Sequence, residues 1–440
     1  MARPSWRLTL LAVLAFAQTM AYYVYLRDDP GNYNGAGAQG DQVEYIALAQ
    51  QILHGTWDGA VHYMPGLPAV IALGQVVFGD PRLGIAVLHG LLYAALVIAA
   101  ASLAARTFGQ PTALAAGAVV ALNPAIGYYA AQALTEFLTG VVLLAAVATA
   151  AAWGRSPGLA RAALLGVLVA LASFLRAEYL GLAIVFAAVL VLAGRSRTAL
   201  LRAGIVVAVT AVCMAPWVIR YTMTTGRPGL YNESPFSNLV LMGTWFRVFD
   251  EQTFSSLQRI ETQPGAREEA IEQASQVGPR PDLSRRYMEQ VRGPYDRPLG
   301  ETLQLASENI QLNLRQYLTN HLLLAPVLIW AGHTPVRQAD TASLPSPARY
   351  AIWAAEMALL LLALWQAVVS LRDRAARAVS LSFLGVVLFL TVVHVVIAVD
   401  ERFTTPALPL IGVFAGARLA LLVPVRRGRM TVLASARRPT

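Results

Sequence analysis

The feature that most constrains this chain is a series of long apolar segments separated by short connections that carry arginine. A helix needs about 20 apolar residues to cross the hydrocarbon core of a bilayer. Candidate spans are residues 8–26, 83–105, 111–129, 134–153, 159–175, 178–194, 203–221, 349–371, 379–399 and 404–424. We therefore expect an all-α integral membrane protein with about ten transmembrane helices.

Composition supports this class. Of 440 residues, 56% are hydrophobic and 13% are charged, whereas soluble proteins are about 25% charged. The net charge of +9 comes from arginine alone, because the chain contains no lysine. Lysine chemistry is thus excluded, and the remaining cations are permanently charged, bidentate anion binders. The lone Cys213 excludes an intrachain disulfide, and the six histidines show no metal-binding spacing.

The arginines predict an orientation. They fall at alternate span ends on one side, at Arg3, Arg7, Arg106, Arg155, Arg161, Arg195, Arg197, Arg202, Arg372, Arg374, Arg377, Arg426, Arg427 and Arg429. The positive-inside rule places that side in the cytoplasm, which also explains the positive charge without nucleic acid as a partner. This orientation requires segment 317–331 to lie in the outer membrane interface rather than to cross the membrane. The N-terminal segment resembles a secretory signal, but its apolar run continues to Leu26, which favours an uncleaved signal-anchor.

Three regions follow from this scheme. Residues 1–221 form an N-terminal transmembrane catalytic module that includes a first external loop, 27–82. Residues 222–348 form an extracytoplasmic subdomain with the interfacial helix 317–331, and residues 349–440 supply C-terminal spans and a short basic cytoplasmic tail. The two external loops, each with juxtamembrane helices, hold nearly all the carboxylates. Segment 65–79 is apolar but too short to span, so we expect an interfacial helix there.

The first loop opens with "GDQVEYIALAQ", residues 40–50. Asp41 and Glu44 have the spacing of a capping box, in which an acid accepts hydrogen bonds from first-turn amides. The same spacing places Asp41, Glu44 and Tyr45 on one helix face, which suits a catalytic site. Both interpretations stay open. A polar and aromatic cluster follows at Trp57, Asp58, His62, Tyr63 and Pro65.

"DQVEYIALAQQILHGTW…HYMPGLPAV" resembles the first external loop of the polytopic C-type glycosyltransferases, the GT-C superfamily. Within that superfamily it is similar to the group of protein O-mannosyltransferases and lipid A aminoarabinose transferases. The resemblance aligns Asp41 with the catalytic acid, and Tyr45, Trp57 and the 63–68 element with further motif positions. Gln42 replaces a second acid of the motif, and Met64 replaces a basic residue, so donor-phosphate contacts are expected elsewhere.

Three later segments extend the resemblance. "NPAIGYYAAQALTEFL" (123–138) resembles the segment that carries an acid at the start of the fourth span, and it places Glu136. "FLRAEYLGL" (174–182) is similar to a basic turn between two spans and contains Arg176. "DERFTTPALPL" (400–410) resembles the signature that opens the last span, and it places Arg402.

The resemblance implies an inverting hexosyl- or pentosyltransferase. Such an enzyme moves a sugar from a polyprenyl-phosphate donor to a hydroxyl of a cell-envelope glycan, glycolipid or protein. The active site would face the extracytoplasmic side of a bacterial cytoplasmic (inner) membrane, a source that the arginine- and alanine-rich usage also indicates. Expected partners are the lipid-linked donor, the acceptor and membrane lipids. No cofactor is expected, and a divalent metal is compatible with this chemistry but not indicated by any residue cluster.

The resemblance also implies roles for individual residues. Asp41 is expected to be the general base, with Glu44 as the alternative. Arg402 and Arg176 are expected to bind the donor phosphate. The expected substrate-binding residues are Tyr45, Trp57, His62, Tyr63 and Glu136.

Structural alternatives remain for these positions. Arg402 would instead pair with Asp400 or Glu401, Arg176 with Glu178, and Glu136 with an arginine of another helix. Trp57 would anchor the chain at the membrane interface, and His62 would be a hydrogen-bonded structural residue.

Two other functions remain open for a chain of this kind. The first is a transporter or flippase for a lipid-linked sugar, for which internal repeats and helices broken near the midplane are expected. The sequence shows no internal repeat, and its acids lie near span ends. The second is a polysaccharide polymerase, which does not explain the D-x-x-x-Y motif directly after the first span.

Overall fold

The computed structural model describes residues 6–27, 41–57, 63–230, 234–294, 297–333, 335–336, 345–397 and 399–422. Within these ranges the regular structure is entirely helical. Eight helices, counted over the described residues, are long and apolar enough to cross a membrane. They are α1 (Trp6–Leu26), α4 (Pro81–Phe108), α7 (Thr135–Arg155), η2 with α9 (Ala177–Gly194), α10 (Arg197–Thr225), α19 (Ser346–Ser370), α20 (Arg377–Ile397) and η4 with α21 (Glu401–Leu422). The predicted all-α, multi-pass membrane fold is confirmed.

The two remaining predicted spans have other shapes. Segment 111–129 is two helices, α5 (Thr112–Ala121) and α6 (Pro124–Ala130), which meet at a bend of 54°. Pro124 lacks an amide hydrogen to continue the first helix. The Asn123 side chain accepts hydrogen bonds from the amides of Ala125 and Ile126 and so starts the second. Segment 159–175 is α8 (Leu159–Leu175), a shorter apolar helix.

Small residues fix the first loop to the bundle. Helix α2 (Asp41–His54) is followed by α3 (Gly66–Phe78), which packs on α4 and α8. A Cβ atom at Gly66 would lie 2.5 Å from the carbonyl oxygen of Phe174, at the end of α8. A Cβ atom at Gly84 of α4 would lie 2.5 Å from the carbonyl oxygen of Gly74. Close backbone contact of this kind is typical of membrane helices, and it leaves α3 little freedom to move.

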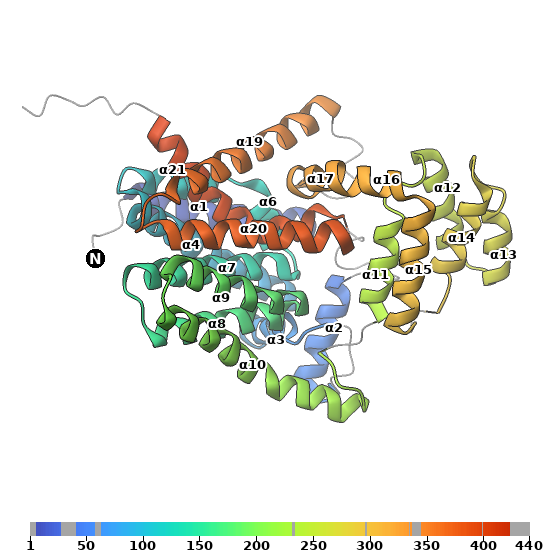
Figure 1. The fold of residues 1–440 in the computed structure, drawn as a ribbon, viewed down its shortest axis with the longest axis horizontal. Helices are drawn as coiled ribbons and strands as arrows, with labels where there is room; N and C mark the ends of the chain where they lie inside the picture. The colour runs from blue at the N-terminus through green and yellow to red at the C-terminus, as the bar shows by residue number, and fades with distance from the viewer. Residues whose placement is uncertain are drawn as a thin grey trace, which may run out of the picture.

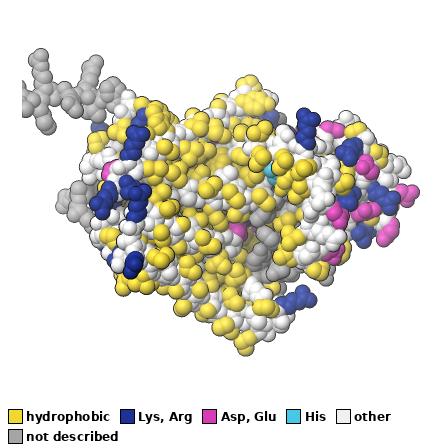
Figure 2. Space-filling view, in the orientation of Figure 1, with side chains coloured by type: hydrophobic (Ala, Val, Ile, Leu, Met, Phe, Trp, Pro, Cys, Tyr) yellow, Lys and Arg dark blue, Asp and Glu magenta, His cyan; other side chains and the backbone are white. Residues whose placement is uncertain are grey.

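Charge is divided between the two ends of the bundle. Figure 2 shows hydrophobic side chains across the middle of the visible face, basic side chains gathered at one end, and mixed charges at the other. Arg155 ends α7 and lies close enough to Arg106 and Arg161 to interact electrostatically. We call this the arginine end. Helix α7 has 21 residues, or about 30 Å, so Glu136 near its start lies at the opposite end.

Helices α11 (Ser234–Thr244), α12 (Glu251–Thr262), α13 (Arg267–Ala274), α14 (Pro281–Val291) and α15 (Leu299–Leu312) gather at the end of the molecule away from the arginine end (Figure 1). We call them the loop helices. Helices α12, α13 and α14, with the residue that follows α11, share a small hydrophobic core formed by Trp245, Leu257, Ala270, Ala274, Leu283, Tyr287 and Met288.

A continuous helical segment leads from the loop helices back to the bundle. It comprises α16 (Leu314–Thr319), the π-helical turn η3 (Asn320–Leu324) and α17 (Ala325–Ala331). Helix α17 packs on α19, α20 and η4. The segment is not among the eight candidate spans of the described residues. The interfacial placement of 317–331 and the three region boundaries stay predictions.

Candidate functional site

The first loop and the last span meet at one carboxylate. Asp41 is the first residue of α2, and its Oδ1 accepts a hydrogen bond of 2.9 Å from the Tyr63 hydroxyl. Its Oδ2 accepts a bond of 2.9 Å from Nη1 of Arg402, 361 positions away in the chain. Both bonds come from side chains outside the helix. The Asp41 carboxylate therefore does more than begin α2, because it also bonds to Tyr63 and Arg402.

Arg402 is held from its other side by Asp400. This acid caps η4 and accepts a hydrogen bond of 2.9 Å from the Arg402 amide. Its Oδ2 lies 3.2 Å from Nε of the same arginine. We call Tyr63, Asp41, Arg402 and Asp400 the shallow chain, because the three charged side chains are 34%, 32% and 40% exposed.

A second group of charges lies deeper. Nη1 of Arg176 lies 3.4 Å from Oε1 of Glu136, and its Nε lies 2.5 Å from Oε1 of Glu178. We call these residues the buried chain, since the Glu136 side chain is 2% exposed and that of Arg176 18%. Burial alone would lower the pKa of Arg176, but Glu178 and Glu136 outweigh it and raise that pKa, which keeps the guanidinium charged. Among the described residues, Oε2 of Glu136 has no hydrogen-bond partner.

The Phe403 ring contacts both the shallow chain and the buried chain. The guanidinium carbon of Arg176 lies 4.5 Å from the centre of its ring, and that of Arg402 lies 4.9 Å away. The His394 ring stacks on Phe403 at 4.5 Å with an interplanar angle of 19°. One aromatic ring thus keeps two cations close together, an arrangement that cation–π attraction favours.

Two tyrosines line the carboxylate. Tyr45 is buried, and its ring centre lies 4.5 Å from that of Tyr63. Burial and the negative charge of Asp41 raise the pKa of Tyr63, so its hydroxyl stays protonated and donates to the carboxylate. Burial also raises the pKa of Tyr45 well above its usual range. Neither phenol competes with Asp41 as a base near neutral pH.

Gln42, which replaces a second acid of the family motif, has a structural contact. Its Nε2 donates to Oε1 of Gln132, and its Oε1 accepts from the Ala133 amide, both at 3.1 Å. These bonds tie α2 to the segment just before α7. The Gln42 amide therefore fixes the distance between Asp41 and Glu136, a role that no charge pattern in the sequence indicates.

Trp57 lies in a different cluster. Its ring stacks on Trp217 at 5.3 Å, and Arg220 lies over its face at 5.2 Å and donates to its backbone carbonyl. The same cluster includes Met64, the residue that replaces the family's basic position. The structure thus shows packing and cation–π contacts for Trp57, and within the described residues no hydrogen bond, ion pair or ring contact joins it to Asp41 or Arg402.

The other predicted residues have separate outcomes. Glu44 is exposed on α2. His62 lies outside the described residues. The described part of the chain holds no group of three or more histidine, cysteine or acidic side chains that could bind a metal. Phe403 and His394 were not among the predicted site residues. Phe403 lies inside the "DERFTTPALPL" segment, and His394 is an ionisable residue inside an apolar span, which is the signal that could have identified it.

The fold and this site define a polytopic membrane protein with a polar, arginine-containing site at one end of its helical bundle. No protein-family model and no curated protein sequence matches the chain.

Among the solved structures, AglB shares the fold of this chain, and ArnT gives a weaker alignment. The oligosaccharyltransferase AglB from Archaeoglobus fulgidus, in complex with an inhibitory peptide and a dolichol-phosphate, aligns with a TM-score of 0.53 over 95% of this chain and 50% of that chain, at 12% identity. Its apo form gives 0.52 at 13% identity over 95% and 51%. ArnT from Cupriavidus metallidurans bound to undecaprenyl phosphate gives 0.39 at 16% identity over 91% and 77%.

The chain spans about half the length of the oligosaccharyltransferase chains that it matches. At 12–13% identity the likeness to AglB concerns the fold alone. It agrees with the all-α, multi-pass membrane fold that the sequence predicts.

Proposed function

We propose that this protein is an inverting membrane glycosyltransferase that moves a sugar from a polyprenyl-phosphate donor to an acceptor hydroxyl. The observation that carries the proposal is the bond between Asp41 and Arg402 in a partly exposed site. It joins a carboxylate, which can accept a proton, to a guanidinium, which can bind phosphate. The fold supports the same class, since AglB was solved with a dolichol-phosphate.

In the proposed reaction Asp41 takes the proton of the acceptor hydroxyl. The acceptor oxygen then forms a bond to the anomeric carbon, and the bond from that carbon to the phosphate oxygen breaks. The electron pair of the broken bond stays on the phosphate. Attack from the face opposite to the leaving phosphate inverts the anomeric centre.

The two arginines stabilise the leaving group in this proposal. Negative charge grows on the phosphate as the bond breaks, and fixed guanidinium groups are suited to hold it. Arg402 is partly exposed and would make the direct contact, whereas Arg176 lies deeper beside the same Phe403 ring and adds positive charge. Glu136 and Glu178 keep Arg176 in position.

The Asp41–Arg402 bond suggests an order of events. Each oxygen of Asp41 already accepts one hydrogen bond, so an acceptor hydroxyl would have to share Oδ2 with the guanidinium or replace it there. A donor phosphate that binds Arg402 would displace Asp41, which would then keep only its bond from Tyr63. Oδ2 of Asp41 would therefore become free for the acceptor hydroxyl when the donor binds.

We place the site on the extracytoplasmic side of a bacterial cytoplasmic membrane. Glu136 and Arg155 lie at opposite ends of α7, so the site and the arginine end are about 30 Å apart. Arginines gather at cytoplasmic ends of spans under the positive-inside rule. The acceptor would then be a cell-envelope glycan, a glycolipid or an exported protein.

The test is a transfer assay with the purified full chain in proteoliposomes. The substrates are radiolabelled polyprenyl-phosphate sugars and an extract of cell-envelope acceptors. We expect transfer by the wild type and a fall of about 100-fold or more in Asp41→Asn, because a general base contributes at least that much. Glu272→Gln, an exposed acid on α13, is the matched control and keeps wild-type activity.

Other results would contradict specific parts of the proposal. Transfer that survives Asp41→Asn but is lost in Glu44→Gln would move the base to Glu44. Movement of the lipid-linked sugar between leaflets without any transfer would favour a flippase.

A further inference from the structure

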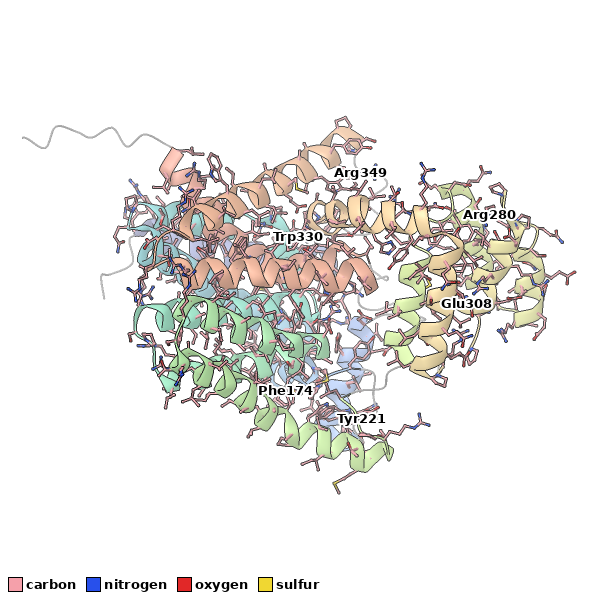
Figure 3. The ribbon with its side chains drawn as sticks, viewed as in Figure 1. Phe174, Tyr221, Arg280, Glu308, Trp330 and Arg349 are labelled. Carbon is pink, nitrogen blue, oxygen red and sulfur yellow. The ribbon has the colours of Figure 1, made fainter. Side chains whose placement is uncertain are left out.

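An open surface cavity of about 510 Å³ lies where the start of α14 meets the end of α15, α16 and η3. Its lining includes two guanidinium groups, Arg280 and Arg315, the amides Asn313 and Gln316, and the apolar residues Leu312 and Leu314. None of these residues belongs to the shallow or the buried chain. Arg280 is labelled in Figure 3, where it lies among the loop helices. The cavity is therefore a second candidate site.

Part of the lining is fixed before any ligand arrives. Nη1 of Arg280 donates to Oδ1 of Asn313 at 3.2 Å, and the Asn313 side chain is buried. Nε2 of Gln316 donates to the carbonyl oxygen of Arg247 at 2.7 Å, and Asn320 donates to that of Phe246 at 2.9 Å. Arg247 has a left-handed φ of 51°, which these side-chain bonds help to hold. A preorganised lining loses less conformational entropy when it binds a ligand.

The cavity carries net positive charge. Arg315 is exposed, and within the described residues it has no ion-pair partner. Arg280 lies 3.6 Å from Asp282, but both side chains are more than half exposed. An exposed pair of this kind is weak, at about 0–1 kcal/mol, so an incoming anion can compete for the guanidinium. Two guanidinium groups that face one cavity suit a phosphate, which each can bind through two hydrogen bonds.

An apolar surface continues from the cavity along α16, η3 and α17. Its exposed members are Leu312, Leu314, Leu318, Leu322, Leu323 and Val327, each between 44% and 69% exposed. The helical segment that carries them leads into the membrane bundle through the contacts of α17 with α19 and α20. Because α17 packs beside the spans α19 and α20 and runs in the direction of α20 (Figure 1), the exposed leucines of this segment are suited to contact lipid chains.

We propose that this cavity binds the phosphate head group of a membrane lipid, with the acyl chains along the leucines of α16 and η3. The two arginines account for the phosphate, and the leucines account for the membrane source. A water-soluble phosphate compound would bind the two arginines but would not contact the leucines. The site lies apart from Asp41 and Arg402, so the inference does not depend on the proposed transferase activity.

Native mass spectrometry of the purified full chain in detergent tests the proposal. The probes are dioleoyl phosphatidylglycerol, phosphate-free dioleoylglycerol and water-soluble glycerol 3-phosphate. We expect phosphatidylglycerol to bind more tightly than either, and Arg315→Gln to raise its Kd about tenfold, since a charge-assisted hydrogen bond contributes about that much. Leu318→Asn is expected to weaken phosphatidylglycerol binding without affecting glycerol 3-phosphate.

Two controls locate the bound lipid. Arg259→Gln removes an exposed arginine of α12 that is outside the cavity lining, and it should leave the Kd unchanged. Arg402→Gln should also leave it unchanged, because Arg402 belongs to the other site. Equal lipid binding by Arg315→Gln and the wild type would overturn the proposal. So would loss of binding in Arg402→Gln alone, or glycerol 3-phosphate binding as tightly as the lipid.

Discussion

The shallow and buried chains use the same residue types in different surroundings. In the shallow chain Asp41 and Arg402 are each about one-third exposed, whereas in the buried chain Glu136 is 2% exposed. Exposed charges can exchange partners with a ligand at little cost, but a buried carboxylate that loses its partner is strongly destabilised. The difference suggests that the shallow chain carries the chemistry and that the buried chain fixes its position.

The largest expected effect comes from breaking the buried chain. Arg176→Gln leaves Glu136 without its cation, so we expect a loss of about 3–5 kcal/mol in the free energy of unfolding. The double variant Arg176→Gln/Glu136→Gln removes both charges and should recover much of that loss. Thermal melting in detergent measures both. Equal melting of Arg176→Gln and the wild type would show that the buried chain does not stabilise the fold.

Breaking the shallow chain should affect transfer instead. Arg402→Gln removes the cation proposed to hold the leaving phosphate, so we expect transfer to fall about 100- to 1,000-fold. Its melting temperature should change much less than that of Arg176→Gln. Arg402→Lys keeps the charge but loses the two-pronged geometry and should be intermediate. A large loss of stability with intact specific activity would reverse the roles of the two chains.

A smaller effect is expected at Tyr63. Tyr63→Phe removes one hydrogen bond to Asp41, which is worth about 1.5 kcal/mol, so transfer should fall about tenfold. Tyr317→Phe, on α16, is the matched control and should leave transfer unchanged. Steady-state transfer rates separate these outcomes. A loss as large as that of Asp41→Asn would give Tyr63 a direct part in the proton transfer.

The smallest effect is expected at Trp57, which lies in the Trp217 cluster. Trp57→Phe keeps an aromatic face for Arg220, so transfer should change by less than about threefold, corresponding to under 0.7 kcal/mol. The same assay measures it. A large rise in KM for the acceptor would show that Trp57 contacts the substrate, as the resemblance implied, and would extend the site beyond the shallow chain.

Much of the fold follows from the sequence because the bilayer imposes a simple length requirement on apolar segments. The break between α5 and α6 was missed, because the prediction of one span over 111–129 rested on length and hydropathy and gave no weight to Asn123 and Pro124. The close contact between Gly74 and Gly84 carries no comparable signal. It depends on which helices become neighbours, and hydropathy does not reveal that.

The candidate site, like the fold, could be predicted from the sequence only in part. Asp41, Glu136, Arg176 and Arg402 were identified from charges near span ends and from the family motifs, and the structure brings all four together. Their pairing was not predictable, because Asp41 and Arg402 are 361 positions apart. The central position of Phe403 was also missed, since an aromatic residue in an apolar segment has many ordinary explanations.

The most direct test of the account is a structure of the full chain in a lipid nanodisc with a polyprenyl phosphate bound. The account predicts the phosphate within hydrogen-bond distance of the Arg402 guanidinium. Asp41 should then be released from Arg402 while its bond from Tyr63 persists. A phosphate bound elsewhere, with the 2.9 Å bond between Arg402 and Asp41 intact, would contradict the proposed exchange of partners.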